Sequence, residues 1–299
     1  MEIVNLRMHN VRKLKPLILE RGVLNTESYI LVLNKKYIKG KVKEDKVFKY
    51  LDAQDDDKVM AKKTATVMAL DSSSYKEIGE LVIPDTIVVV DERIAGFGMP
   101  LIKDHRNLGI IINDDDEKLK TKLRYLKEVG TLIDRVQRQD DEYSLNFGDL
   151  NEFNFIVDKD DHVRAVDLDS SYIGSGSPTY TAYYLLKNPY IKQVPEKYQV
   201  TRFNQVIPSD NSDLYCYNMI LLNAMSGIDM FKKDIPTYYG YTSYLKELGL
   251  PSDLIRGFND IYTPAPNINP KDMLDELNII PEKELKFKTY VKRKRPYDI

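Results

Sequence analysis

The sequence predicts an α+β protein with two lobes, a small β-rich lobe over residues 1–102 and a larger, mostly helical lobe over residues 103–299. Two observations support this class. Short β-rich runs joined by polar turns fill the first third of the chain. From residue 210 onward, helix-like segments separated by Pro and Gly follow one another. A β-rich front and a helical rear predict a crevice between the two lobes.

The amino-acid composition limits the classes of function that the chain can have. The chain has 299 residues, of which 42% are hydrophobic, which is ample for a buried core. Lys and Arg number 44 against 46 Asp and Glu, so the net charge of -2 argues against a nucleic-acid partner. One cysteine and three scattered histidines exclude an intramolecular disulfide and a His/Cys metal cluster. With no signal peptide or membrane span in the sequence, we expect a cytoplasmic protein without a membrane partner.

Five strands and one helix are expected in the β-rich lobe. Polar turns separate the first three strands, and the helix starts with aspartates, as helix N-termini prefer. The strands are YILVL (29–33), KKYIKGKV (35–42), KVFKYL (46–51), IVVV (87–90) and RIAGFGMPLI (93–102), and the helix covers about 57–71. In the second lobe, leucines and valines at spacings of three and four over 114–138 predict an amphipathic helix.

The stretch 145–171 carries the candidate chemistry. Its two strand-like runs, FNFIV and HVRAV, flank the turn 158–161 and predict a hairpin. Asp149 and Asn154 precede or begin the first run, and Asp167 follows the second, so we expect the three side chains to converge. Their oxygens would suit a hard cation such as Mg²⁺. The alternative is that these residues only form turns and caps, as polar residues at strand ends usually do.

The spacing in this stretch resembles that of protein kinases, which carry H-R-D-L-x-x-x-x-N and, after a short hairpin, D-F-G. Here the chain reads F-G-D-L-N-E-F-N and then D-L-D. Further similarity, in the same order as in the family, is found in GSPTYTAYYL (176–185), SDLYCYNMILLNAMSG (212–227) and the segments LPSDLIRGFNDIY and NPKDMLDEL. The chain therefore resembles the protein-kinase-like superfamily over about residues 28–280, in a divergent form of the bacterial, eukaryotic-like Ser/Thr type.

This resemblance implies a two-lobed kinase-like fold that uses ATP and Mg²⁺ to phosphorylate a hydroxyl group. Asp149 would be the catalytic base, and Asn154 and Asp167 would be the metal ligands. Lys49 falls where the family has the third-strand lysine that contacts the phosphates. The remaining implied sites are the gatekeeper Met99, with Leu101 and Ile102 near the adenine, and Asp213, which would be buried and accept hydrogen bonds from backbone amides near Phe147 and Gly148.

Other positions depart from the family pattern. The first hairpin region has only Gly22 and Gly40 in place of G-x-G-x-x-G, and the helix 57–71 lacks a glutamate to pair with Lys49, leaving Asp71 as the nearest acid. Phe147 and Gly148 replace His-Arg, and Asn151 replaces a lysine. These departures leave two alternatives open: a pseudokinase that acts as a nucleotide-binding or scaffolding module, and a small-molecule kinase of the same fold.

Two further segments have open interpretations. Asp169 is interpreted as a turn residue rather than a second metal ligand, because the family needs only the first aspartate. The basic tail LKFKTYVKRKRP (285–296) is either solvated or a site for an acidic partner. The leading hypothesis is an ATP- and magnesium-dependent phosphotransferase, a divergent Ser/Thr protein kinase acting on a protein or, alternatively, on a small-molecule hydroxyl.

Overall fold

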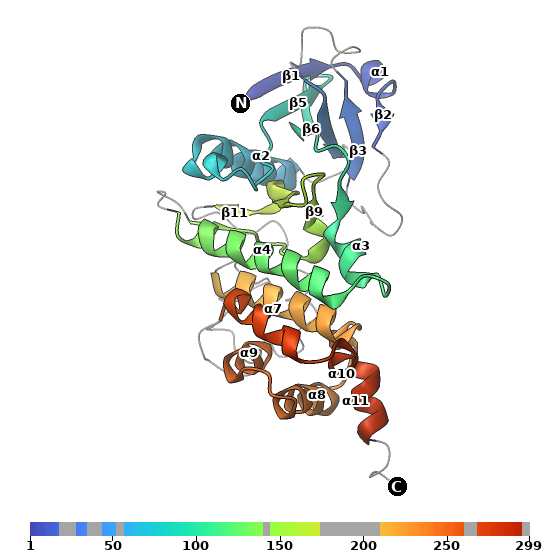
Figure 1. The fold of residues 1–299 in the computed structure, drawn as a ribbon. Helices are drawn as coiled ribbons and strands as arrows, with labels where there is room; N and C mark the ends of the chain where they lie inside the picture. The colour runs from blue at the N-terminus through green and yellow to red at the C-terminus, as the bar shows by residue number, and fades with distance from the viewer. Residues whose placement is uncertain are drawn as a thin grey trace. The chain divides into compact units, whose positions relative to one another are not determined.

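The chain forms two compact units in a computed structural model, drawn in Figure 1. The first unit combines Met1–Asn107, Gln139–Leu145 and Phe153–Thr179, and the second combines Leu108–Arg138, Asn146–Glu152 and Tyr180–Ile299. A multistranded sheet with helices makes the protein mixed α and β, in agreement with the α+β class. The structure describes residues 1–17, 28–34, 44–51, 57–139, 144–173, 210–259 and 268–294.

A six-stranded sheet forms the body of the first unit, in the order β1-β5-β6-β4-β3-β2. The strands β1 and β5 are parallel, and every other neighbouring pair is antiparallel. The bounds are β1 Glu2–Leu6, β2 Lys15–Pro16, β3 Ser28–Leu33, β4 Lys46–Leu51, β5 Thr86–Val90 and β6 Arg93–Pro100. The strands expected at 29–33, 46–51, 87–90 and 93–102 are therefore present, whereas β1 and β2 were not expected, and the run 35–42 lies outside the described residues.

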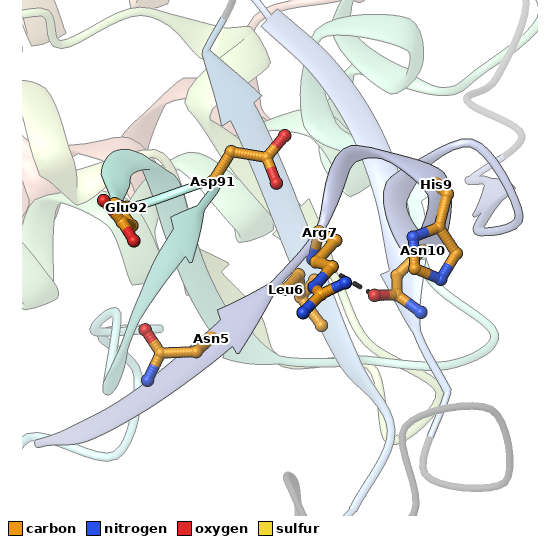
Figure 2. Close-up of a pocket in the computed structure, with 7 residues that line it drawn as sticks. All are labelled: Asn5, Leu6, Arg7, His9, Asn10, Asp91 and Glu92. Atoms are coloured by element: carbon orange, nitrogen blue, oxygen red, sulfur yellow. Dashed lines mark hydrogen bonds between the residues drawn. The ribbon is translucent and has the colours of Figure 1, made fainter.

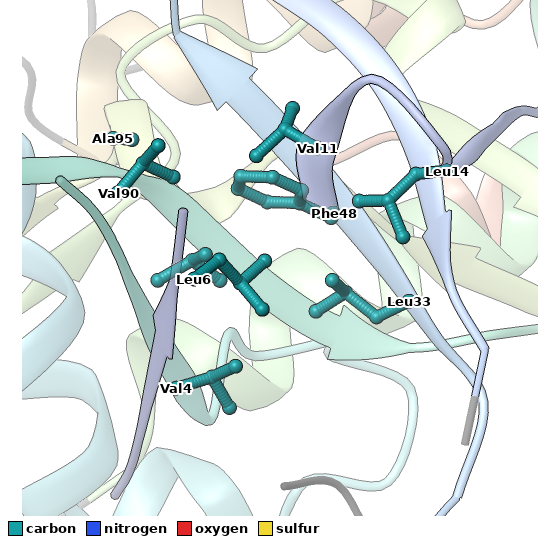
Figure 3. Packing of buried hydrophobic residues seen from close by; sticks show 9 residues of the cluster. Val4, Leu6, Val11, Leu14, Leu33, Phe48, Val90 and Ala95 are labelled. Carbon is teal, nitrogen blue, oxygen red and sulfur yellow. The ribbon is translucent and has the colours of Figure 1, made fainter. Parts of the chain in front are cut away.

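Both faces of this sheet are covered. On one face, buried apolar side chains from β1, β3, β5, β6 and the segment around helix α1 (Met8–Val11) surround Phe48 of β4 (Figure 3). On the other face, Leu51, Ile87 and Phe97 pack with Val67 of helix α2 (Asp57–Ser72). Since successive strand residues point to opposite faces, Lys49 lies on the same face as Leu51, towards α2.

Glycine permits the close approach of β4 and β6 beside Lys49. Tyr50 is paired with Gly96, and a Cβ atom at position 96 would lie 1.9 Å from the carbonyl oxygen of Lys49. The φ angle of Gly96, 150°, is also one that residues with a side chain rarely adopt. The residue at position 96 must therefore be glycine for Lys49 to keep its place in the sheet.

The rest of the first unit contains short elements. A three-stranded sheet has the order β10-β9-β7, with β7 Arg106–Asn107, β9 Phe155–Val157 and β10 Val163–Ala165. The antiparallel pair β9 and β10 is the expected hairpin. The 3-10 helices are η1 Ser74–Glu77, η2 Glu152–Asn154 and η3 Leu168–Ser170, and two further short strands are β8 Leu145–Asn146 and β11 Tyr172–Ile173; η2 and β8 each include one residue of the second unit.

Helices make up most of the described part of the second unit. Helix α4 (Leu119–Gln137) starts five residues later than the expected 114–138, and all the periodic leucines and valines that predicted it are buried. It packs against α7 (Asp210–Ser226) and η6 (Lys271–Ile279), and the hydroxyl of Tyr217 donates to the carbonyl of Leu126 at 2.7 Å. The other elements are α3 Leu108–Asn113, η4 Met230–Lys232, α8 Ile235–Glu247, α9 Ser252–Phe258, α10 Glu282–Leu285 and α11 Phe287–Lys294.

The basic tail is partly folded. Its residues 287–294 form α11, whose Phe287 and Tyr290 are buried, with ring centroids 5.5 and 5.7 Å from that of Tyr241. The exposed Arg293 forms an ion pair with Glu284. The tail is thus not wholly solvated, because one side of it packs in the core of the helical unit; binding of an acidic partner by its cations stays a prediction. Within the described ranges, no helix is both long and apolar enough to span a membrane.

Candidate functional site

The hairpin β9-β10 places the backbone next to Asp167 beside that of Asn154; convergence of their side chains stays a prediction. The backbone N–H of Val166, the neighbour of Asp167, donates to the carbonyl of Asn154 at 2.9 Å. The turn of the hairpin is held by Asp158, whose carboxylate accepts from the backbone N–H groups of Asp160 and His162, each at 3.0 Å. This is the behaviour of aspartate in tight turns.

Lys49 points from β4 to the end of that hairpin, across 118 residues of sequence. Its side chain is only 4% exposed, and its ammonium group contacts the carboxylate of Asp167 directly. The same group lies 3.0 and 3.1 Å from the two carboxylate oxygens of Asp169. A lysine and the carboxylate predicted to hold a metal are therefore neighbours in the first unit.

The prediction that Asp169 is only a turn residue is wrong. It is not a simple turn residue, because its side chain is 0% exposed and forms ion pairs with both Lys49 and Lys63. Lys63, from helix α2, donates to Asp169 Oδ2 at 2.8 Å and to Ser170 Oγ at 2.7 Å. The acid that Lys49 lacked in the helix is thus supplied by Asp167 and Asp169, whereas Asp71 pairs with the N-terminal amino group.

The two carboxylates have opposite electrostatic environments. Burial raises the pKa of Asp167 to about 6, and repulsion from Asp169 adds to this effect, although Lys49 lowers it. Burial also acts to raise the pKa of Asp169, but the ammonium groups of Lys49 and Lys63 outweigh it and hold that pKa well below its usual range. Together, Asp167 and Asp169 outweigh the burial of Lys49 and raise its pKa. Asp169 is therefore the firmly ionised partner.

The oxygen ligands available around Asp167 are of the type that binds a magnesium ion. Mg²⁺ usually takes one or two carboxylates from the protein and completes its shell with waters and substrate phosphates. Asp167 offers such a carboxylate with a side chain that is 33% exposed, and Asn154, whose backbone carbonyl accepts from Val166, would supply an amide oxygen. Over the described residues, no group of three or more His, Cys, Asp or Glu side chains could hold a metal by itself. The donor set therefore suits a cation that is bound jointly with a phosphate ligand.

The predicted adenine-contacting residues continue from β6. Met99 is paired with Val47 and lies, like Lys49, on the sheet face towards α2; it is buried. Leu101 and Ile102 follow the strand and are partly exposed, and the carbonyl of Ile102 is 2.8 Å from His105 Nδ1. Contact of these three residues with a nucleotide stays a prediction.

The second unit holds the other two predicted site residues. Asp213 is 3% exposed, and its carboxylate accepts from the backbone N–H of Phe147 at 2.8 Å, as the sequence predicted. Asp149, two residues further on, is partly exposed, and the amide of Asn151 donates to its carbonyl at 3.1 Å. The carboxylate of Asp213 thus holds the backbone beside Asp149. Because Asp149 and Asp167 belong to different units, their convergence stays a prediction.

Part of the kinase resemblance lies outside the described residues. This applies to the glycines Gly22 and Gly40 and to the segment 176–185.

The roles of Lys63 and Asp169 in this site were not predicted from the sequence. Lys63 shares one face of α2 with Val67 and Leu70, the spacing of an apolar stripe, and a lysine on such a stripe was the available signal.

The first unit also has a pocket of about 530 Å³ between the end of β1 and the turn that joins β5 to β6 (Figure 2). Charges of both signs line it, from Arg7, Asp91 and Glu92, and none of the predicted site residues does. Asp91 and Glu92 have φ angles of 45° and 69°, as two-residue hairpin turns require. This pocket therefore does not belong to the candidate site.

In comparisons with known proteins, no protein-family model and no curated protein matched the chain.

Proposed function

We propose that the chain is an ATP- and magnesium-dependent phosphotransferase, a divergent Ser/Thr protein kinase. The observation that supports this most is the buried lysine of β4, which meets the carboxylate at the end of the β9-β10 hairpin. Burial of a charged group is unfavourable, and ionisable groups that are buried together are often found at functional sites. A buried lysine between two carboxylates therefore fits a binding site for a charged ligand.

In this proposal, each of the predicted site residues has a separate role in phosphoryl transfer. Asn154 and Asp167 hold the metal ion, which would neutralise charge on the ATP phosphates. Lys49 contributes its positive charge to the same phosphates. Asp149 orients the acceptor hydroxyl and accepts its proton. Asp213, through its bond to the Phe147 amide, keeps the backbone beside Asp149 in place.

Nucleotide binding and transfer are tested separately. The melting temperature is measured with ATP and MgCl₂, and transfer of labelled phosphate is followed to the chain itself and to a general protein substrate. A ligand at 100 times its Kd stabilises a protein by about 2.7 kcal/mol, a clear thermal shift. Binding without transfer would favour the pseudokinase alternative, and transfer only to small hydroxyl compounds would favour a small-molecule kinase. If ATP causes no shift and no transfer occurs, the proposal is wrong.

Lys46 provides a matched control for Lys49. Both lysines are buried in β4 and paired with carboxylates, Lys46 with Asp85 at 2.6 Å, but they lie on opposite faces of the sheet. We expect Lys49→Met to abolish the nucleotide-dependent shift and Lys46→Met to preserve it, whatever either change does to the melting temperature without ligand. Equal responses of the two variants would contradict the site.

A further inference from the structure

Lys49 has two carboxylate partners, and they are not equivalent. The side chain of Asp167 is 33% exposed, and that of Asp169 is fully buried. Asp169 faces Lys49 with both oxygens, at 3.0 and 3.1 Å. One partner is therefore open to a ligand, and the other is closed to it.

The proposed role of Asp167 makes the second partner necessary. A carboxylate that binds a divalent cation shares its oxygens with that cation, and the cation repels a neighbouring ammonium group. If Asp167 were the sole counter-ion, metal binding would leave Lys49 buried without compensation, which is unfavourable. Asp169 supplies a second counter-charge, so Lys49 would keep a carboxylate partner when Asp167 binds the metal.

Lys63 holds Asp169 from the opposite side. It is buried in α2, lies 2.8 Å from Asp169 Oδ2, and also donates to Ser170 Oγ at 2.7 Å. The four residues carry two positive and two negative charges, so the cluster is neutral. A tie between helix α2 and the η3 segment would need only the pair Lys63 and Asp169. The placement of Lys49 against both oxygens of the same carboxylate goes beyond such a tie.

We propose that Asp169 is the permanent counter-ion that positions Lys49, and that Lys63 fixes Asp169 in place. This assignment rests on the proposed phosphotransferase function and adds two positioning residues to it. Neither side chain touches the nucleotide. Both act through Lys49, whose ammonium group they keep beside the metal-binding carboxylate.

A double substitution separates positioning from a structural tie. In Lys63→Met/Asp169→Asn the charges of the tie are removed together, and neutral replacement of a buried ion pair often preserves stability. A structural tie therefore predicts that the double variant behaves like the parent. Positioning predicts a stable variant in which Lys49 keeps only Asp167 of its two carboxylate partners. The control is Lys62→Met, which removes an exposed lysine next to Lys63 in the same helix.

Two readouts report on Lys49. The first is the rate at which an amine-acylating reagent modifies Lys49, followed by mass spectrometry without nucleotide. The second is the KM for magnesium-ATP compared with kcat. We expect the double variant to acylate at Lys49 about tenfold faster and to have a KM raised about tenfold, with a smaller change in kcat, because a hydrogen bond to a charged group is lost. Lys62→Met should match the parent in both.

Each outcome has a distinct meaning. Parent-like acylation and KM in a folded double variant would overturn the positioning role. Faster acylation of Lys49 in a protein that neither binds nor transfers phosphate from ATP would support the ion-pair assignment and refute the phosphotransferase function. If the double variant does not fold, Lys63→Gln/Asp169→Asn replaces it, since two amides can hydrogen-bond to each other, and the same criteria apply.

Discussion

Replacement of Asp169 by asparagine should destabilise the protein much more than the same replacement at Asp167. Asp169 is fully buried and accepts contacts of 2.8, 3.0 and 3.1 Å from two ammonium groups. Asn at this position keeps the shape but removes the carboxylate that Lys49 and Lys63 share, whereas Asn at position 167 leaves that shared carboxylate in place. Breaking a buried ion pair on one side costs about 3 to 5 kcal/mol. At about 2 to 4 °C per kcal/mol, the melting temperature should fall by about 10 °C.

Asp167→Asn should lower the melting temperature at pH 7.5 by much less than Asp169→Asn does, because the side chain of Asp167 is 33% exposed. Its pKa of about 6 in the folded protein lies above the ordinary value of 3.8, so folding disfavours its ionised form. The stability that this group contributes is full below pH 3.8 and is lost as the pH rises through 6. At pH 7.5, an amide therefore removes a charge that burial disfavours, but it also removes one of the two carboxylates that face Lys49, so the two effects on stability oppose each other. For Asp169, whose pKa is lowered, the sign is opposite: its contribution is present above pH 3.8 and lost in strong acid.

The assay is thermal unfolding of the parent and both variants without nucleotide, followed by circular dichroism at pH 7.5 and at pH 4. Nucleotide and magnesium are then added at pH 7.5, where Asp167→Asn should lose the metal-dependent shift despite its intact fold, because an amide is a neutral and weaker ligand for a hard cation. An Asp169→Asn protein as stable as Asp167→Asn at pH 7.5 would refute the division of roles between the two carboxylates.

Four other predictions concern the elements that support the site. Asp149→Asn should keep magnesium-dependent nucleotide binding and lose phosphate transfer, because in the proposed function its carboxylate acts on the acceptor hydroxyl; loss of binding would contradict this. Asp213→Ala should cost about 1 to 3 kcal/mol in unfolding experiments, since it leaves the buried amide of Phe147 without its acceptor; unchanged melting would contradict this. Asp158→Ala should cost about 1 to 2 kcal/mol at pH 7 and less as the pH falls below 3.8, because hydrogen bonds from His162 and Arg164 outweigh burial and lower the pKa of Asp158; a constant difference across that range would refute the assignment. Gly96→Ala should disrupt the sheet beside Lys49, with a lowered melting temperature and no nucleotide-dependent shift, and a parent-like protein would show that β4 and β6 do not approach this closely.

The strands and helices with strong periodicity could be predicted from the sequence. Helix α4 has leucines and valines at every turn, and β4 and β5 are dense in apolar and β-branched residues. Strand β1 was missed because it has five residues and its outward-facing Ile3, 65% exposed, disguises the alternation of buried Val4 and Leu6. Its pairing with β5 joins residues about 84 positions apart, and such pairing leaves no local signal.

The hairpin with Asn154 and Asp167 was predictable because its two flanks are close in sequence. Lys63 was not, because its partner Asp169 is 106 residues away and a single lysine in a helix is usually exposed. The absence of a glutamate in this helix was visible in the sequence. That a lysine in the helix pairs with a second aspartate on η3 could only be found once the tertiary contacts were known.

The backbone at Asp167 explains how two aspartates of one D-L-D segment acquire different environments. Asp167 has φ 64° and ψ 36°, the left-handed conformation, which is uncommon for residues other than glycine and tolerated best by Asn and Asp. Leu168, between the two aspartates, is buried, and Asp169 lies within η3. Such a conformation persists where the surrounding contacts impose it, and here Lys49 contacts both carboxylates. The left-handed turn therefore lets one lysine meet two carboxylates, of which the first remains partly exposed and the second is buried against Lys63.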